Sequence, residues 1–169
     1  TIQVPTLRLN SRSLQQPFDQ PDWTEVMCKV PEAVAEDWGG RSSGGVGDTT
    51  FTQWSLDMVG RMHQAGVPIG AGTDTPIGFA VPGFSLHSEL QLLVRAGLPP
   101  IEALRAATLR PAEFFGLEDE MGTIEPGRVA DLVLLSADPL ADITNTRMIS
   151  AVVTRGALLG RAELDALVR

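Results

Sequence analysis

The stretch GVPIGAGTD, residues 66–74, is a short continuous run of apolar and small residues that ends in a carboxylate. Runs of this kind are typical of strands covered on both faces of a parallel sheet. Residues 49–65 carry large apolar side chains at three- and four-residue spacing, which predicts a helix that ends at Gly66 and packs on the sheet. The expected face is Phe51, Trp54, Met58, Met62 and Ala65. A helix followed by a buried strand indicates an α/β fold.

Further helices are expected on both sides of this unit. Upstream, a helix is expected around 24–35 and a glycine- and serine-rich loop at 39–47. Downstream, Ser85 offers a hydroxyl cap to a helix that stops at Gly97. A second helix starts near Pro100, and Pro111 opens a third, short one. The positions expected to be buried on the first two are Leu86, Leu90, Leu93, Ile101, Leu104 and Thr108.

Both ends of the chain have strand-like patterns. Strands are expected at 131–136 and within 148–159, where Arg155 and Gly156 can form a tight hairpin turn. At the start, Pro5 removes one ladder donor, so a strand there should lie at an edge or carry a bulge. Its apolar positions are Ile2, Val4, Leu7 and Leu9. A small β segment therefore follows an α/β segment.

The composition is that of a folded acidic protein. The chain has 169 residues, with Lys+Arg 13, Asp+Glu 21 and a formal net charge of −8, and 43% of its residues are hydrophobic. A single lysine, Lys29, in an acidic chain argues against nucleic-acid partners. No apolar run approaches the ~18 residues of a membrane span. One cysteine, Cys28, excludes an intrachain disulfide. The opening residues lack the zones of a signal peptide, so we expect a cytoplasmic location.

Asp74 is the main candidate for chemistry. A carboxylate directly after a buried strand lies at the carboxyl end of a parallel sheet, where ligands and catalytic groups of α/β folds collect. There it can bind a divalent metal or move a proton. The alternative is an Asp that caps a turn with Thr75 and Pro76, and the local pattern favours neither.

The other reactive side chains form no catalytic motif. His63 and His87 belong to no paired-histidine motif, and a surface or packing role is favoured for each, with His87 the better ligand candidate because it follows a Gly/Pro-rich loop. The serines lack a nucleophile elbow, and Cys28 has no histidine nearby in sequence. The glycines at 45 and 47 do not form a phosphate-binding loop.

Taken in order, three stretches resemble the C-terminal part of the metal-dependent amidohydrolase superfamily, closest to its imidazolonepropionase-like and prolidase-like members. They are AGVPIGAGTD at 65–74, PGFSLHSELQLLVRAGLPPIEALRAATLRPAEFFGL at 82–117 and MGTIEPGRVADLVLLSADPLADI at 121–143. The opening VPTLRLN also looks like the family's seventh barrel strand. The resemblance implies the last two strands and helices of a (β/α)8 barrel in residues 1–120 and part of a composite β-sandwich in 121–169.

The resemblance also implies a role for Asp74. In such enzymes the Asp of the GTD motif ends strand eight, binds the metal and accepts a proton from metal-bound hydroxide. The hydroxide attacks a polarised carbonyl, and the carboxylate passes the proton to the leaving nitrogen. The divalent metal is expected to be Zn in the full-length parent, although an Asp oxygen also suits Mn, Fe or Mg. The loop 75–83 would face a small-molecule substrate, with Thr75, Ile77, Phe79 and His87 as candidates.

The family's HxH pair, its frequent carboxylated lysine and its other histidines have no counterpart here. A complete (β/α)8 barrel takes about 250 residues, so we expect a truncated piece that is inactive by itself and that can lack the metal. Exposed barrel edge and apolar surface predict self-association. Two alternatives stay open. One is a non-catalytic α/β interaction module in which the acidic stretch 113–142 is a solvated face. The other is a deaminase, lactonase or phosphotriesterase of the same superfamily.

Overall fold

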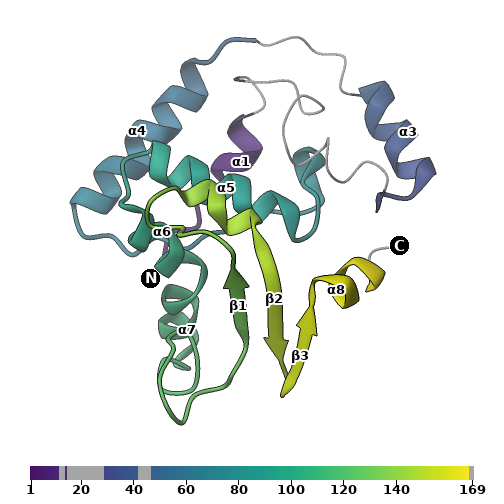
Figure 1. Cartoon of the computed structure of the whole chain (residues 1–169). Helices are drawn as coiled ribbons and strands as arrows, with labels where there is room; N and C mark the ends of the chain where they lie inside the picture. Colours follow the sequence, from purple (N-terminus) through teal and green to yellow (C-terminus); the bar gives the residue numbers. More distant parts are fainter. Residues whose placement is uncertain (12–13, 15–28, 42–46, 168–169) are drawn as a thin grey trace.

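The fold consists of a helical layer above a small antiparallel sheet (Figure 1). The computed structural model describes residues 1–11, 14, 29–41 and 47–167. The helices are α1 (Leu7–Asn10), α3 (Glu32–Arg41), α4 (Thr50–Gln64), α5 (Phe84–Arg95), α6 (Pro100–Ala107), α7 (Leu109–Phe115) and α8 (Arg161–Leu167). The 3-10 turns are η4 (Ile77–Phe79) and η5 (Ile143–Arg147), and the strands are β1 (Leu132–Leu135), β2 (Ile149–Thr154) and β3 (Ala157–Gly160). Residues 24–28, which include Cys28, and residues 42–46 lie outside the described residues. The helix expected around 24–35 is seen from Glu32 onward as α3, and the loop expected at 39–47 was wrong for residues 39–41, which end that helix.

The start of the chain lies parallel to the 66–74 stretch. Gln3 and Ile69 form an isolated parallel bridge, in which the Gln3 N–H donates to the Pro68 carbonyl at 2.9 Å and the Gly70 N–H to the Gln3 carbonyl at 2.8 Å. The parallel neighbour is as expected, but the pairing is one bridge and not two full strands. Pro5 and Pro68 have no N–H to extend it.

The predicted first strand ends earlier than the sequence pattern suggests. Leu7–Asn10 is a short helix and not the continuation of a strand. The backbone N–H groups of Leu7 and Arg8 both donate to the buried carboxylate of Glu89, 82 and 81 residues away. This tertiary contact satisfies N–H groups that a strand would have given to a neighbour, and the local alternation of apolar residues does not reveal it.

Helix α4 spans the predicted residues but buries another face. Phe51 and Trp54 are 59% and 53% exposed, with their rings stacked 5.7 Å apart between centroids. The buried residues are Thr52, Ser55, Leu56, Val59 and Gly60. The prediction of the buried face was wrong because the two hydroxyls find backbone acceptors, Asn10 for Thr52 and Phe51 for Ser55. Buried polar groups are tolerated where they are paired in this way.

Helix α5 ends as expected and begins differently. Gly97, with φ 107°, follows its C-terminus. The N-cap is Gly83, at φ 77°, and not Ser85, which is fully buried and accepts the Val81 N–H at 2.8 Å. In α6, the buried residues are Ala103 and Ala106. Ile101 is 41% exposed and Thr108 is exposed, so their predicted burial was wrong.

Most of the core lies between α4, α5 and α6. It consists of Leu7, Leu56, Val59, Ile69, Leu90, Leu93, Leu98, Ala103, Ala106 and Ile143. Helix α1 packs against both α4 and α5, so the start of the chain belongs to this core (Figure 1). None of the helices in the described ranges is long and apolar enough to cross a membrane.

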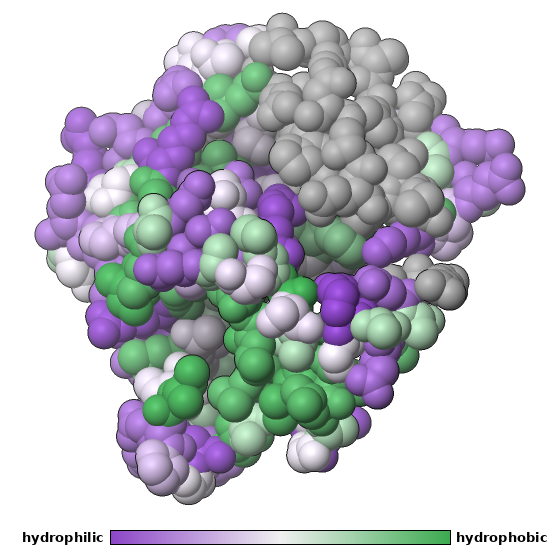
Figure 2. Space-filling view, viewed as in Figure 1, coloured by the Kyte–Doolittle hydropathy of each residue, from purple (hydrophilic) through white to green (hydrophobic). Residues whose placement is uncertain are grey.

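The sheet has the order β1-β2-β3 with both pairs antiparallel, and the hairpin of β2 and β3 is as the sequence predicts. Arg155 (φ 50°) and Gly156 (φ 79°) form the two-residue turn between β2 and β3, where both central residues need positive φ. Cross-strand register places Leu132, Val153 and Leu158 on one face, together with Leu134 two residues on. Leu134 is 45% and Leu158 63% exposed, and Figure 2 shows apolar side chains gathered over this sheet. We call these four residues the open sheet face.

Candidate functional site

Asp74 follows directly after the segment that pairs with the start of the chain. A Cβ on Gly70 would lie 2.9 Å from the Ile2 side chain, and one on Gly72 would lie 2.5 Å from Val4. The two glycines therefore allow residues 2–4 to approach this segment closely. Asp74 itself is exposed, and its φ of 53° is in the left-handed region. Its carboxylate thus lies at the solvent-facing carboxyl end of the paired segment.

The loop after Asp74 is folded back on itself. The Ile77 N–H donates to the Asp74 carbonyl at 2.8 Å, and the hydroxyls of Thr73 and Thr75 are hydrogen-bonded at 2.7 Å. Ile77 is 56% exposed. Phe79 is only 5% exposed, and its ring meets that of Trp38 edge to face at 5.8 Å. Phe79 is therefore part of an apolar cluster, and the expectation that it faces substrate needs correction.

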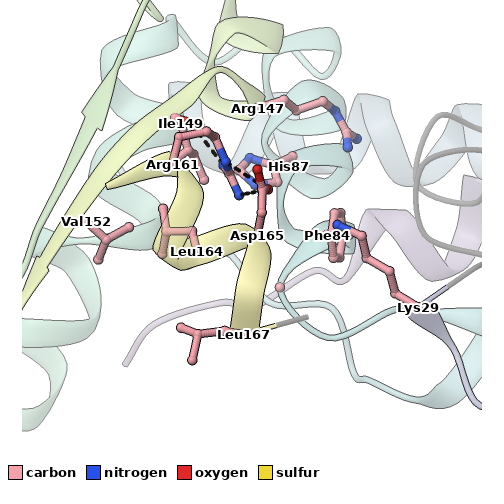
Figure 3. A pocket seen from close by; sticks show the side chains of 11 residues that line it. Lys29, Phe84, His87, Arg147, Ile149, Val152, Arg161, Leu164, Asp165 and Leu167 are labelled. Atoms are coloured by element: carbon pink, nitrogen blue, oxygen red, sulfur yellow. Dashed lines mark hydrogen bonds and ion pairs between the residues drawn. The ribbon is translucent and has the colours of Figure 1, made fainter. Parts of the chain in front are cut away.

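His87 is part of α5 and lies close to η5 and to strand β2 of the sheet. Its Nδ1 is hydrogen-bonded to the Thr146 hydroxyl at 3.0 Å. Figure 3 shows it beside a cavity of about 450 Å³ that also borders β2 and α8. The lining is Lys29, Gly83, Phe84, His87, Arg147, Ile149, Val152, Arg161, Leu164, Asp165 and Leu167. Asp74 is not among these residues, so the structure does not place the two candidates in one cavity.

The charged groups that line this cavity contact other groups of the protein. Arg161 pairs with Asp165 at 2.8 Å and donates to the Ile149 carbonyl at 3.1 Å. Arg147 donates to the Ser88 hydroxyl at 2.9 Å, and the Lys29 ammonium lies 5.7 Å from the centre of the Phe84 ring. The remaining lining is mostly apolar.

Glu89 and Arg8 were not singled out by the sequence pattern. Both are 0% exposed, and the Glu89 carboxylate accepts the Leu7 N–H at 3.0 Å and the Arg8 N–H at 2.6 Å. Burial raises the pKa of Glu89 to about 7, while the two N–H groups and the Arg8 charge act in the opposite direction. A sequence signal for the burial of Glu89 was available, since Glu89 lies three residues after Leu86 and four before Leu93, two positions of the face expected to be buried.

The described residues do not form a complete metal site. Within the described ranges, no group of three or more His, Cys, Asp or Glu side chains comes together. A zinc ion in a protein takes at least three converging ligands, and Asp74 supplies one carboxylate. These residues alone therefore do not fit a resident metal, whatever other parts of a longer protein would add.

The acidic stretch is solvated, as one of the alternatives expected. Its acidic residues are all exposed, namely Glu113, Glu118, Asp119, Glu120, Glu125, Asp131, Asp138 and Asp142. Several serve local structure. Asp142, for example, accepts the Thr144 N–H at 2.9 Å, which lowers the pKa of its carboxyl. This stretch is a surface and not a candidate site.

Comparison with known proteins gives the family. The amidohydrolase family matches residues 55–159. The imidazolonepropionase of Symbiobacterium thermophilum is 34% identical over 103 residues, which is 59% of this chain and 24% of that protein. Adenine deaminase 3 of Rhizobium meliloti is 39% identical over 95 residues, 56% of this chain and 15% of that protein. The chain therefore belongs to the amidohydrolase family.

Solved structures agree with this assignment. A candidate prolidase from Bifidobacterium longum superposes with a TM-score of 0.65 and 31% identity, covering 99% of this chain and 38% of that one. A molinate hydrolase superposes with a TM-score of 0.56 and 28% identity over 94% of this chain and 31% of that one. The mixed α/β fold is thus that of amidohydrolases. The chain spans well under half the length of each of these relatives.

Proposed function

We propose that this chain is the C-terminal part of a hydrolase that acts on carbon–nitrogen bonds, and that Asp74 is its functional carboxylate. The observation that carries the proposal is the position of Asp74, exposed at the carboxyl end of a segment with a parallel neighbour. Catalytic groups of parallel α/β folds come from this end of the strands. The relatives reported above support the proposal, because the names imidazolonepropionase and adenine deaminase denote enzymes that act on carbon–nitrogen bonds.

Asp74 would act as a metal ligand and as the acceptor of a proton. A divalent metal, expected to be Zn, would supply Lewis-acid chemistry when bound, with its other ligands coming from outside the described residues. A bound ligand can reach Asp74 because its side chain is exposed. The small-molecule substrate would contact the same loop, with Thr75 and exposed Ile77 as the nearest candidates and His87 further along the chain.

The division of the chain follows from the same proposal. Residues 1–120 would be the last part of a (β/α)8 barrel, and residues 121–169 would contribute β1, β2 and β3 to a β-sandwich. The parallel bridge of Gln3 with Ile69 supports the barrel part, because neighbouring barrel strands are parallel. The open sheet face supports the second part, since an apolar face of a sandwich sheet packs on another sheet.

The coding DNA upstream of the Thr1 codon tests the proposal. An open reading frame that encodes an HxH pair and at least two further histidines would supply the ligands that the described residues lack. A stop codon or an unrelated sequence there would contradict it and favour the non-catalytic interaction module. Assays of the longer product with an imidazolone, adenine and an Xaa-Pro dipeptide would then separate the hydrolase from the deaminase, and a lactone and a phosphotriester would test the remaining alternatives.

A further inference from the structure

Two segments far apart in sequence, α1 and α5, meet at the buried carboxylate of Glu89. The carboxylate lies on α5 and accepts two backbone N–H groups from α1, at 3.0 Å from Leu7 and 2.6 Å from Arg8. One carboxylate thus fixes the backbone at the point where the chain leaves the bridge of Gln3 with Ile69. The contact also supplies an acceptor to two backbone N–H groups that are buried.

The side chain of Arg8 carries this connection on to the loop after Asp74. Arg8 is 0% exposed, and its guanidinium donates to the Phe79 carbonyl at 3.2 Å. Phe79 closes the turn η4, in which the Ala80 N–H donates to the Ile77 carbonyl at 3.2 Å and the Ile77 N–H to the Asp74 carbonyl at 2.8 Å. A continuous series of hydrogen bonds therefore leads from Glu89 through Arg8 to Asp74.

The loop between Asp74 and Phe79 needs such support. Its first and last residues, Asp74 at φ 53° and Phe79 at φ 62°, both lie in the left-handed region, which is costly for residues other than glycine. Backbone of this kind persists only where surrounding contacts hold it. The contacts that hold Phe79 include those of its ring in the cluster with Trp38 and the hydrogen bond of its carbonyl to Arg8.

Packing alone does not explain a buried Glu and a buried Arg. Moving ionised groups out of water is expensive, and a well-packed apolar pair of similar volume is often as stable or more stable. What an apolar pair cannot do is accept the N–H groups of Leu7 and Arg8 or donate to the Phe79 carbonyl. The two polar side chains therefore fix directions and distances, in addition to filling space.

We propose that Arg8 and Glu89 are positioning residues that hold the loop 75–79 and thereby set the orientation of Asp74. The inference rests on the proposed function for its biological meaning, because Asp74 matters only if it acts on a ligand. Its physical content is separate: removing the Arg8 guanidinium should loosen the loop while the packing of α4 and α5 persists.

Amide hydrogen exchange by NMR on the full 169-residue chain tests the proposal. In Arg8→Met, which keeps an unbranched stem, the amide protons of Ile77 and Ala80 should exchange about tenfold faster or more, since a hydrogen bond to a charged donor is lost. The amide proton of Val59, within α4, should change much less. Arg8→Lys, which retains one cationic donor, should restore part of the protection and part of the wild-type carboxyl ¹³C shift of Asp74.

Arg61→Met is the matched control, because Arg61 is exposed and its ion pair with Asp57 lies on α4 alone. The proposal is overturned if Ile77 and Ala80 exchange in Arg8→Met as they do in Arg61→Met, or if Val59 is accelerated equally, which would indicate a general loss of stability. If Arg8→Met does not fold, the exchange rates of the Ile77 and Ala80 amide protons in Glu89→Gln provide the same test. None of these measurements needs metal or substrate, so a failure here is separate from a failure of Asp74 as a functional residue.

Discussion

The Glu89 carboxylate accepts the backbone N–H of Arg8 at 2.6 Å in the core, although 81 residues separate the two in sequence. This contact joins the first residues of the chain to α5 and, through the Arg8 guanidinium, to the Phe79 carbonyl of the loop that follows Asp74. The candidate site and the start of the chain therefore belong to one packed unit. Changes at Glu89 should affect both.

The raised pKa of Glu89 predicts that its contribution to stability falls as pH rises. The folded chain holds the proton up to about pH 7, whereas the unfolded chain releases it near the ordinary value of 4.5. The contribution is therefore fully present below 4.5 and is lost as pH rises through about 7, by about 3 kcal/mol.

Denaturant unfolding of the wild type and Glu89→Gln between pH 4.5 and 8 measures this effect. The difference in free energy of unfolding between the two should change across that range in favour of the variant at high pH. A constant difference would show that Glu89 titrates at the same pH in both states. The exposed residue Glu36, changed to Gln, serves as control.

Gly60→Ala should destabilise the chain, although alanine is the better helix former. A Cβ at Gly60 of α4 would clash with the backbone carbonyl of Ala96, which closes α5 and cannot rotate away. We expect a loss of about 1–3 kcal/mol, the usual cost of overpacking, measured by chemical denaturation. Gln53→Ala on the exposed side of the same helix should be neutral or slightly stabilising. An increase in stability in Gly60→Ala would contradict the close approach of the two helices.

The open sheet face predicts self-association of the chain. Leu134 on β1 and Leu158 on β3 expose apolar area on the two outer strands of the described sheet, and apolar area at a sheet edge favours pairing with another copy. Sedimentation velocity at micromolar concentration should show species larger than a monomer, and Leu158→Lys should reduce them. Ile124→Lys, 86% exposed and outside the strands, is the control. A monomeric wild type would refute the prediction.

Metal content provides a further check on the completeness of the site. After equilibration with Zn²⁺ and removal of free metal, the 169-residue chain should retain much less than one ion, because a single carboxylate does not hold zinc. Native mass spectrometry measures this directly. Stoichiometric metal that disappears in Asp74→Ala would mean that a site assembles here after all, within one chain or between two.

The sequence pattern predicted correctly those helices and turns that depend on residues close together in the chain. The helix before Gly66, the stop at Gly97 and the hairpin at Arg155 and Gly156 depend on spacing and on residues with special φ, which the sequence displays. The buried face of α4 and the helix at Leu7 were missed. Both depend on partners far along the chain, Asn10 for Thr52 and Glu89 for Leu7, and no short window contains these pairs.

In the candidate site, too, the sequence predicted what depends on nearby residues and missed what depends on distant ones. Asp74 could be singled out because a carboxylate follows an apolar run, and the family resemblance could be read from ordered motifs. The burial of Phe79 could not, because its ring meets Trp38, 41 positions earlier, and its carbonyl meets Arg8. The role of Arg8 and Glu89 depends on the same long-range contacts.

The central claim is that Asp74 is the functional carboxylate of a hydrolase that acts on carbon–nitrogen bonds. The most direct test is the turnover number of the protein that the longer reading frame encodes. Asp74→Asn should lower kcat by about a hundredfold or more, the usual effect of losing a proton acceptor. Asp57→Asn, exposed on α4, should leave kcat unchanged. A kcat in Asp74→Asn equal to that of the wild type would contradict the account.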